Sequence, residues 1–211
     1  MKKLVGKLDD EFIDKQVDEG IKLATSMSKT IDDFRNFFKP NKVEENFSIL
    51  KVIKEAMDLV EHYYERIGIK ITLKCEQEFE VRGYPNEFSQ VLMNLFSNAK
   101  DILKEKKDQI KLIEIVVKID EEDKDIGMIG VVDNGGGISQ EVLDRMFDPY
   151  FTTKHQSSGT GIGLYMSKEI IEKQMHGSII AQNCSHTFAQ NEKKYDKCAC
   201  LIIKMPIKKE S

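Results

Sequence analysis

The amino-acid sequence predicts an α/β domain preceded by a long N-terminal helix. Apolar residues near the start recur at alternating spacings of four and three, which is the seam of a heptad repeat. From Phe47 onward, segments with helical periodicity alternate with segments in which every second residue is apolar. With 211 residues, 40% of them hydrophobic, the chain can bury one substantial core beside a smaller helical appendage.

The N-terminal helix is predicted over residues 1–40. Pro40 ends it, since proline disfavours helix at the residue before it. A helix this long cannot bury its apolar stripe alone, so it must pack on a partner helix, on a second copy, or on the chain's own globular domain. The heptad positions are Ile13, Val17, Gly20, Ala24, Met27, Ile31, Phe34 and Phe38.

The first half of the α/β region begins with an amphipathic helix over 49–66. Ser48 is a good N-cap for it, and Gly68 follows its end. Strict alternation then predicts a strand over Ile69–Cys75. A turn at 83–85 leads into a helix over 86–105.

The second half continues the alternation. We expect strands at 112–119 and 126–132, a short helix capped by Ser139, a glycine-rich loop over 148–162, a helix over 163–175, and strands near 177–183 and 198–206. The polar residues between the last two strands predict a mobile hairpin.

Charge and composition exclude several classes of protein. The net charge of -4 gives no basic face for nucleic acid. No apolar run approaches the roughly 20 residues of a membrane span, and no apolar stretch follows the basic start as in a signal peptide. The four cysteines, Cys75, Cys184, Cys198 and Cys200, fit reduced thiols better than a zinc site. A cytoplasmic location is therefore expected, although the parent protein could be membrane-anchored.

The first of four notable segments runs from Gln90 to Asp101. Asn94 and Asn98 lie four residues apart on the predicted helix, so their side chains share one face. A carboxamide oxygen can bind Mg²⁺, which prefers hard oxygen ligands. The alternative is a pair of buried amides that hydrogen-bond neighbouring loops.

The second segment, Asp133-Asn-Gly135-Gly-Gly137-Ile138, directly follows an apolar strand. Its glycines permit positive φ and close approach of a ligand to the backbone. An aspartate at the end of a strand can accept a hydrogen bond from an exocyclic amine. Alone, the segment is also ordinary turn chemistry.

The other two segments lie close together. In Phe147-Asp-Pro-Tyr-Phe-Thr-Thr-Lys154, aromatic residues ahead of a lysine could fold over a ligand, or could pin the loop to the core. Gly159-Thr-Gly161-Ile-Gly163-Leu164 opens a helix, where backbone N–H groups and the helix dipole suit phosphates. No Walker lysine follows, which disfavours a P-loop.

In this order, the four segments resemble the nucleotide-binding boxes of the GHKL ATPase superfamily, over residues 47–207. The wording is most similar to that of sensor histidine kinases of two-component systems. The resemblance implies a two-layer α/β sandwich, the Bergerat ATP-binding fold, with a mixed sheet and helices on one face. It makes residues 47–211 the catalytic ATP-binding domain. Residues 1–40 would then be the second helix of a dimerisation and phosphotransfer hairpin.

The resemblance also implies a role for each residue. Asn98 would hold Mg²⁺ against the ATP phosphates with support from Asn94, and Lys154 would neutralise phosphate charge; these three would be the catalytic residues. Asp133 would bind the adenine amine. The nucleotide-binding set would be Asn94, Asn98, Asp101, Asp133, Gly135, Gly137, Ile138, Lys154, Gly159, Thr160, Gly161, Ile162, Gly163 and Leu164.

The implied function is transfer of the γ-phosphoryl group of Mg·ATP to a histidine. Related ATPases have a glutamate that activates water where Asn94 stands, and asparagine cannot act as a general base. The implied partners are the phospho-accepting helix, a response regulator receiver domain and a second copy of the full-length protein. None of the four histidines is followed by Glu or Asp, so the acceptor is expected elsewhere. The alternatives are a GHKL ATPase or anti-sigma-type serine kinase, and a non-catalytic nucleotide-binding or dimerising module.

Overall fold

The computed structural model describes residues 43–106, 109–154 and 160–208, together with positions 16, 17, 20, 21 and 24. Those five isolated positions are helical, as the sequence predicts, and they are exposed. They include three heptad positions, Val17, Gly20 and Ala24. The other heptad positions lie outside the described residues, and the boundaries of the two predicted domains stay predictions.

Five strands form one mixed sheet with the order β2-β4-β5-β7-β6. β2 pairs parallel with β4, and every other neighbouring pair is antiparallel. The strands are β2 (Ile69–Cys75), β4 (Lys111–Ile119), β5 (Ile126–Asp133), β6 (Ser178–Phe188) and β7 (Lys193–Pro206). A separate two-stranded sheet pairs β1 (Glu45–Ser48) with β3 (Glu80–Gly83).

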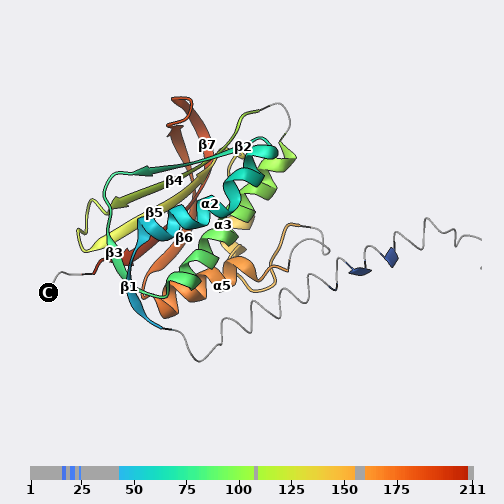
Figure 1. Ribbon diagram of the computed structural model, residues 1–211. Coiled ribbons are helices and arrows are strands. Elements are labelled where there is room, and N and C mark those ends of the chain that lie inside the picture. The colour runs from blue at the N-terminus through green and yellow to red at the C-terminus, as the bar shows by residue number, and fades with distance from the viewer. Residues whose placement is uncertain are drawn as a thin grey trace, which may run out of the picture.

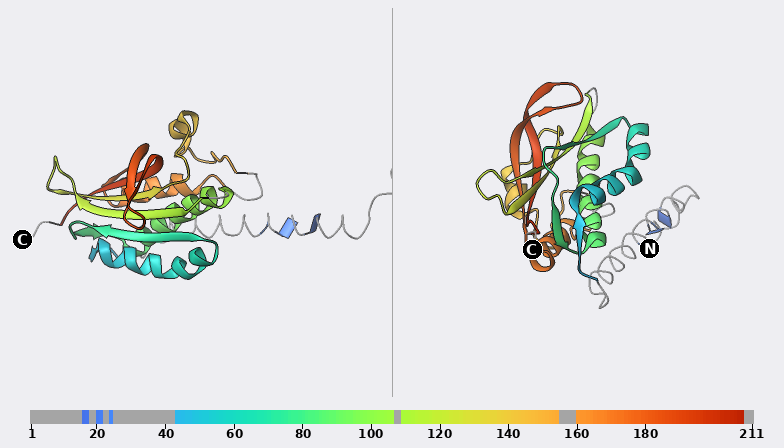
Figure 2. Two further views of the ribbon diagram at one scale, coloured as in Figure 1. Left: turned by 90° about the horizontal axis from the view of Figure 1, so that it is seen from above. Right: turned by 60° about the vertical axis from the view of Figure 1, so that its left-hand side comes forward.

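The helices cover one face of the five-stranded sheet, as the resemblance implied (Figures 1 and 2). They are α2 (Ile49–Arg66), α3 (Pro85–Glu105) and α5 (Gly163–Glu169), which continues as the π-helical turn η1 (Ile170–Gln174). The main core lies between these helices and the sheet. Phe88, Phe96 and Ile113 are fully buried in it. A short helix, α4 (Gln140–Arg145), follows β5.

The opposite face of the sheet carries a smaller apolar cluster beneath the β6–β7 hairpin. Phe188 is fully buried there. Glu114 of β4 is 1% exposed; it contacts His186 Nε2 at 2.6 Å and accepts the Ala189 N–H at 2.9 Å. These contacts attach the hairpin, drawn in brown and red in Figure 1, to the sheet.

Most elements lie where the sequence predicts them, with four differences. β1 and β3 were not predicted. The predicted helix over 163–175 changes to π-helix at Ile170. The polar excursion between the last strands is itself strand, because β6 continues to Phe188 and β7 begins at Lys193. Ser139 takes the N-cap position of α4 without a side-chain hydrogen bond, whereas Ser48 caps α2 as predicted.

Within the described part of the chain, no helix combines the length and the apolar character that crossing a membrane requires.

Candidate functional site

The site is built along one face of α3. Asn94 and Asn98 are four residues apart, so they are stacked on that face, and Asp101 and Ile102 continue it by one more turn. The opposite face of α3 holds Leu92 and Phe96 in the core. Core packing therefore fixes the helix and turns the two carboxamides and the carboxylate toward the loops that follow β5 and α4.

Lys154 reaches these oxygens from the loop that precedes α5. Its Nζ lies 2.7 Å from Asp101 Oδ2 and 3.2 Å from Asn98 Oδ1. Burial raises the pKa of the Asp101 carboxyl, but Lys154 and Lys100 together outweigh burial, and the pKa lies below its ordinary value. The ammonium group of Lys154 is thus held between the side-chain oxygens of Asn98 and Asp101.

Asn94 has a different environment. Its Nδ2 donates to Ser167 Oγ at 2.9 Å, and Ser167 Oγ donates to the Gly163 carbonyl at 3.0 Å. A β-carbon at Gly163 would collide with the Asn94 carboxamide oxygen. Asn94 therefore fixes the start of α5 against α3.

Asp133 ends β5 at the edge of the main core and is 5% exposed. Its Oδ1 accepts the Gly135 N–H at 2.8 Å. Burial raises its pKa to about 6, although the Gly135 hydrogen bond and the nearby Lys106 act in the opposite direction. Ile102 of α3 covers the same loop, because a β-carbon at Gly135 would lie 2.6 Å from Ile102 Cγ2.

The rest of the first glycine loop is held by asparagines. Asn183 of β6 accepts the Ile138 N–H through Oδ1 and donates to the Ile138 carbonyl through Nδ2, both at 2.7 Å. Gly137 has a φ of +78°, and a β-carbon there would lie 2.6 Å from Asn183 Oδ1. Asn134 is buried and bonds the Leu112 N–H at 2.9 Å. The hydrogen bonds of these two asparagines fix the backbone conformation of the loop.

The second glycine loop packs against the segment that carries Lys154. Gly161 has a φ of +67°, and a β-carbon there would lie 2.7 Å from the Tyr150 carbonyl oxygen. Tyr150 itself has a φ of +65°, a strained value for a residue with a β-carbon. Thr160 Oγ1 accepts the Ile162 N–H at 3.4 Å, and Leu164 packs on the main core. Gly159 lies outside the described residues.

The first predicted segment is part of α3, and the structure brings the other three to that helix. Asn94 contacts the start of α5, Asn98 and Asp101 hold Lys154, and Ile102 covers Gly135. Sequence reasoning missed four residues of this arrangement: Ile102, Lys106, Ser167 and Asn183. Ile102 continues the spacing of Asn94 and Asn98 and could have been found by it. The other three meet their partners only in the folded chain.

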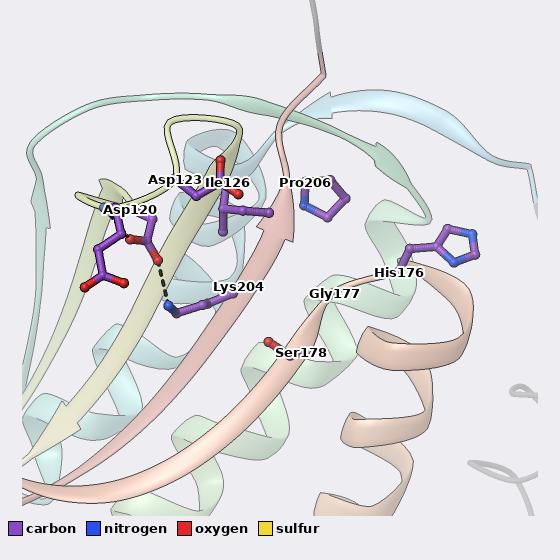
Figure 3. Close-up of a pocket in the computed structure, with 9 residues that line it drawn as sticks. Asp120, Asp123, Ile126, His176, Gly177, Ser178, Lys204 and Pro206 are labelled. Carbon is purple, nitrogen blue, oxygen red and sulfur yellow. Dashed lines mark hydrogen bonds and ion pairs between the residues drawn. The ribbon is translucent and has the colours of Figure 1, made fainter.

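A shallow hollow of about 360 Å³ is not part of this site (Figure 3). Ile126, Pro206 and the ion pair between Asp120 and Lys204 line it. It lies at the start of β5, whereas Asp133 ends that eight-residue strand, so the two are roughly 23 Å apart.

Comparison with known proteins identifies the family of this chain. Residues 83–208, more than half of the chain, match the family described as "Histidine kinase-, DNA gyrase B-, and HSP90-like ATPase". The matched region contains all four segments.

Two curated relatives and one solved structure are similar to this chain. The two-component sensor PprA of Pseudomonas aeruginosa is 36% identical over 51% of this chain and 12% of its own length. The sensor protein DegM of Bacillus sp. (strain B21-2) is 30% identical over 94% of this chain and 48% of its own length. The chain thus spans less than half the length of either relative.

The solved catalytic domain of histidine kinase ThkA is 25% identical, with a TM-score of 0.63. The match covers 78% of this chain and 95% of that domain. The fold that this chain shares with the ThkA domain agrees with the family match. The chain therefore belongs to the histidine kinase-, DNA gyrase B- and HSP90-like ATPase family, as a catalytic domain of the sensor histidine kinase type.

Proposed function

We propose that this domain binds Mg·ATP along α3 and transfers the γ-phosphoryl group to a histidine on a dimerisation hairpin in two-component signalling. The observation that carries the proposal is the convergence of four segments on one helix face. That face carries a cation-binding pair of oxygens at Asn98 and Asp101, and Asp133 at the end of β5 adds a buried acceptor for a base.

Asp133 would recognise the adenine. Its Oδ1 is occupied by the Gly135 N–H, which leaves Oδ2 to accept a hydrogen bond from the exocyclic amine. Gly135 and Gly137 keep the loop free of side chains, so the base can approach the backbone closely. Ile102 and Ile138 supply apolar surface beside that position.

Asn98 and Asp101 would hold the Mg²⁺. Both present hard oxygens, and both already bind the ammonium group of Lys154, so the pair fits a cation. Mg²⁺ supplies neutralisation of the charge on the β- and γ-phosphates. Lys154, displaced from the two oxygens, would move to the phosphates, and the N–H groups from Gly161 to Leu164 would bind them at the start of α5.

The chemistry at Asn94 favours transfer over hydrolysis. A carboxamide cannot take a proton from water, and its Nδ2 is already bonded to Ser167 Oγ. ATP would therefore stay intact until a better nucleophile, the imidazole of a histidine, enters in line with the γ-phosphorus.

The proposed partners follow from this reaction. They are the histidine-bearing helix, a second copy of the full-length protein that pairs with it, and a receiver domain that takes the phosphoryl group onward. PprA is named as a two-component sensor, which supports the receiver domain. Because the reaction draws on cellular ATP, we place the domain in the cytoplasm.

Label transfer from γ-labelled ATP tests the proposal. The protein is incubated with Mg²⁺ and ATP, alone and with a histidine-bearing hairpin from a two-component kinase. We expect ATP to bind and remain intact in the first case, and acid-labile label to appear on the hairpin in the second. Asp133→Ala should abolish both binding and transfer.

Two results would contradict the proposal. Steady release of free phosphate that Asp133→Ala removes would identify an ATPase. Tight ATP binding without transfer to any hairpin, including one fused ahead of residue 1, would identify a non-catalytic nucleotide-binding module.

A further inference from the structure

We propose that Lys106, beside the first glycine loop, favours the carboxylate form of Asp133 and thereby selects a purine with an exocyclic amine over one with a carbonyl at the same position. The inference rests on the proposed function, because it takes Asp133 as the residue that meets the base. It makes Lys106 a specificity-determining residue that acts through Asp133.

Lys106 stands at the mouth of the first glycine loop. It is the C-cap residue of α3, and its N–H donates to the Leu103 carbonyl. A β-carbon built at Gly136 would lie 3.4 Å from Lys106 Nζ. The ammonium group therefore lies at contact distance from the position of a side chain at Gly136, one residue beyond Gly135 and its hydrogen bond to Asp133.

The surroundings of Asp133 make this charge matter. Burial favours the neutral acid, and the Gly135 hydrogen bond opposes burial. Among the described groups, Lys106 is the charge that lowers the pKa of this carboxyl. The thiols of Cys184, Cys198 and Cys200 on β6 and β7 lie near it on the opposite face of the sheet, and on its own face Lys197 of β7 lies beside Gly137. Burial raises the pKa of each thiol, so the thiols stay neutral where Asp133 titrates.

The protonation state of Asp133 decides which base fits. A carboxylate only accepts hydrogen bonds, so it matches the amine of adenine and repels a carbonyl oxygen. A protonated carboxyl can donate to a carbonyl, as in hypoxanthine. Loss of the Lys106 charge would therefore weaken ATP binding and reduce discrimination against inosine triphosphate.

The experiment measures dissociation constants of ATP and inosine triphosphate between about pH 5 and about pH 8, where such a carboxyl titrates. The proteins are wild type, Lys106→Met, Lys106→Arg and the matched control Lys104→Met. Lys104 is two residues earlier, and its Nζ donates to Tyr63 OH, so its removal changes net charge equally without reaching the loop. Titration of the nucleotide phosphates is common to all four proteins and cancels in the comparison.

Wild-type affinity for ATP should fall as the pH drops through about 6, because the binding carboxylate is lost. In Lys106→Met the midpoint should move to higher pH. At pH values below the wild-type midpoint, each pH unit by which the midpoint moves should lower the affinity for ATP by about tenfold. The preference for ATP over inosine triphosphate should fall in parallel, while Lys106→Arg and Lys104→Met follow the wild type.

Several outcomes would overturn the inference. An unchanged midpoint in Lys106→Met would do so. An equal loss of affinity for both nucleotides at every pH would also do so, since it would place Lys106 on the phosphates. In an Asp133→Asn background the carboxyl at position 133 is absent, so Lys106→Met should have no further pH-dependent effect. A pH-dependent effect that persists in that background would overturn the inference as well. If wild type bound neither nucleotide at any pH, the proposed function itself would fail.

Discussion

Four glycines of the site, Gly135, Gly137, Gly161 and Gly163, lie where a β-carbon would collide with a neighbour. At Gly135 the nearest atom belongs to the side chain of Ile102. At Gly137 and Gly163 the neighbour is an asparagine side chain, which has some freedom to move. At Gly161 it is the backbone of Tyr150, which has none. The second glycine loop therefore packs tightly against the segment that carries Lys154.

Gly161→Ala should therefore weaken ATP binding by at least about tenfold, because the positive φ and the collision both force the loop away from α3. Gly130→Ala is the matched control, since the nearest atom to its added carbon is Val116 Cβ at 4.0 Å. Isothermal titration calorimetry measures both affinities. Equal affinities for the two variants would contradict the tight packing of Gly161 on Tyr150.

At the residue scale, the sequence was informative where chemistry is local. Asn94 and Asn98 share a face by helix periodicity alone, and Asp133 follows a strand that is predicted from an apolar run. Ser167 and Asn183 were not predicted. Their partners, Asn94 and Ile138, are 73 and 45 positions away in the chain, and no periodic pattern encodes a contact between residues so far apart in sequence.

At the scale of elements, α2 shows how a helix end is fixed. Ser48 ends β1 and accepts the Lys51 N–H at 3.1 Å, and its hydroxyl donates to Glu78 Oε1 at 2.7 Å. One side chain thus caps the helix and joins it to the segment before β3. The N-cap of α4, Ser139, makes no such side-chain bond.

Ser48→Ala should destabilise the fold by about 1 kcal/mol, the usual cost of losing an N-cap. Ser139→Ala should change stability by less than about 0.5 kcal/mol, as for most surface substitutions. Urea denaturation followed by circular dichroism gives both values, and nucleotide affinity should be unchanged in both. A Ser139→Ala effect as large as that of Ser48→Ala would show that the Ser48 hydroxyl contributes nothing specific.

Elements were predicted where burial imposes a regular pattern, as in α2 and β2. β1 and β3 have four residues each, too few for alternation to be distinguished from a turn. The hairpin beyond Asn183 reads as polar because half of each strand faces water. It is stabilised by the buried contacts of Phe188 and Glu114, which its local composition does not reveal.

At the scale of the whole molecule, the site opposes the core on which it is built. Asp133 lies at the end of a central strand, beside buried residues such as Val131 and Ile113. A carboxylate there serves recognition of an amine, yet its burial disfavours the charged form. The buried charge of Asp133 should therefore lower the free energy of unfolding by a measurable amount, as a consequence of the role of this residue in recognition.

Asp133→Asn should reveal that loss. The folded-state pKa of about 6 exceeds the ordinary value of 3.8, so the folded protein holds the proton more tightly than the unfolded chain. The stability that this carboxyl contributes is complete below about pH 4 and is lost as the pH rises through about 6. Asparagine keeps the Gly135 hydrogen bond and removes the charge. A pKa shift from 3.8 to about 6 is about 2.2 units at about 1.36 kcal/mol each, so the variant should be more stable than wild type by about 3 kcal/mol at pH 7.

The gain should disappear at about pH 4, where both side chains are neutral. Urea denaturation at the two pH values measures it, and the difference between variant and wild type cancels the titration of every other group. Because asparagine presents an amide instead of a second carboxylate oxygen, the stabilised variant should bind ATP at least about tenfold more weakly. A gain that is equal at both pH values would show that Asp133 is not held charged against burial, and recognition of the base would then need another residue.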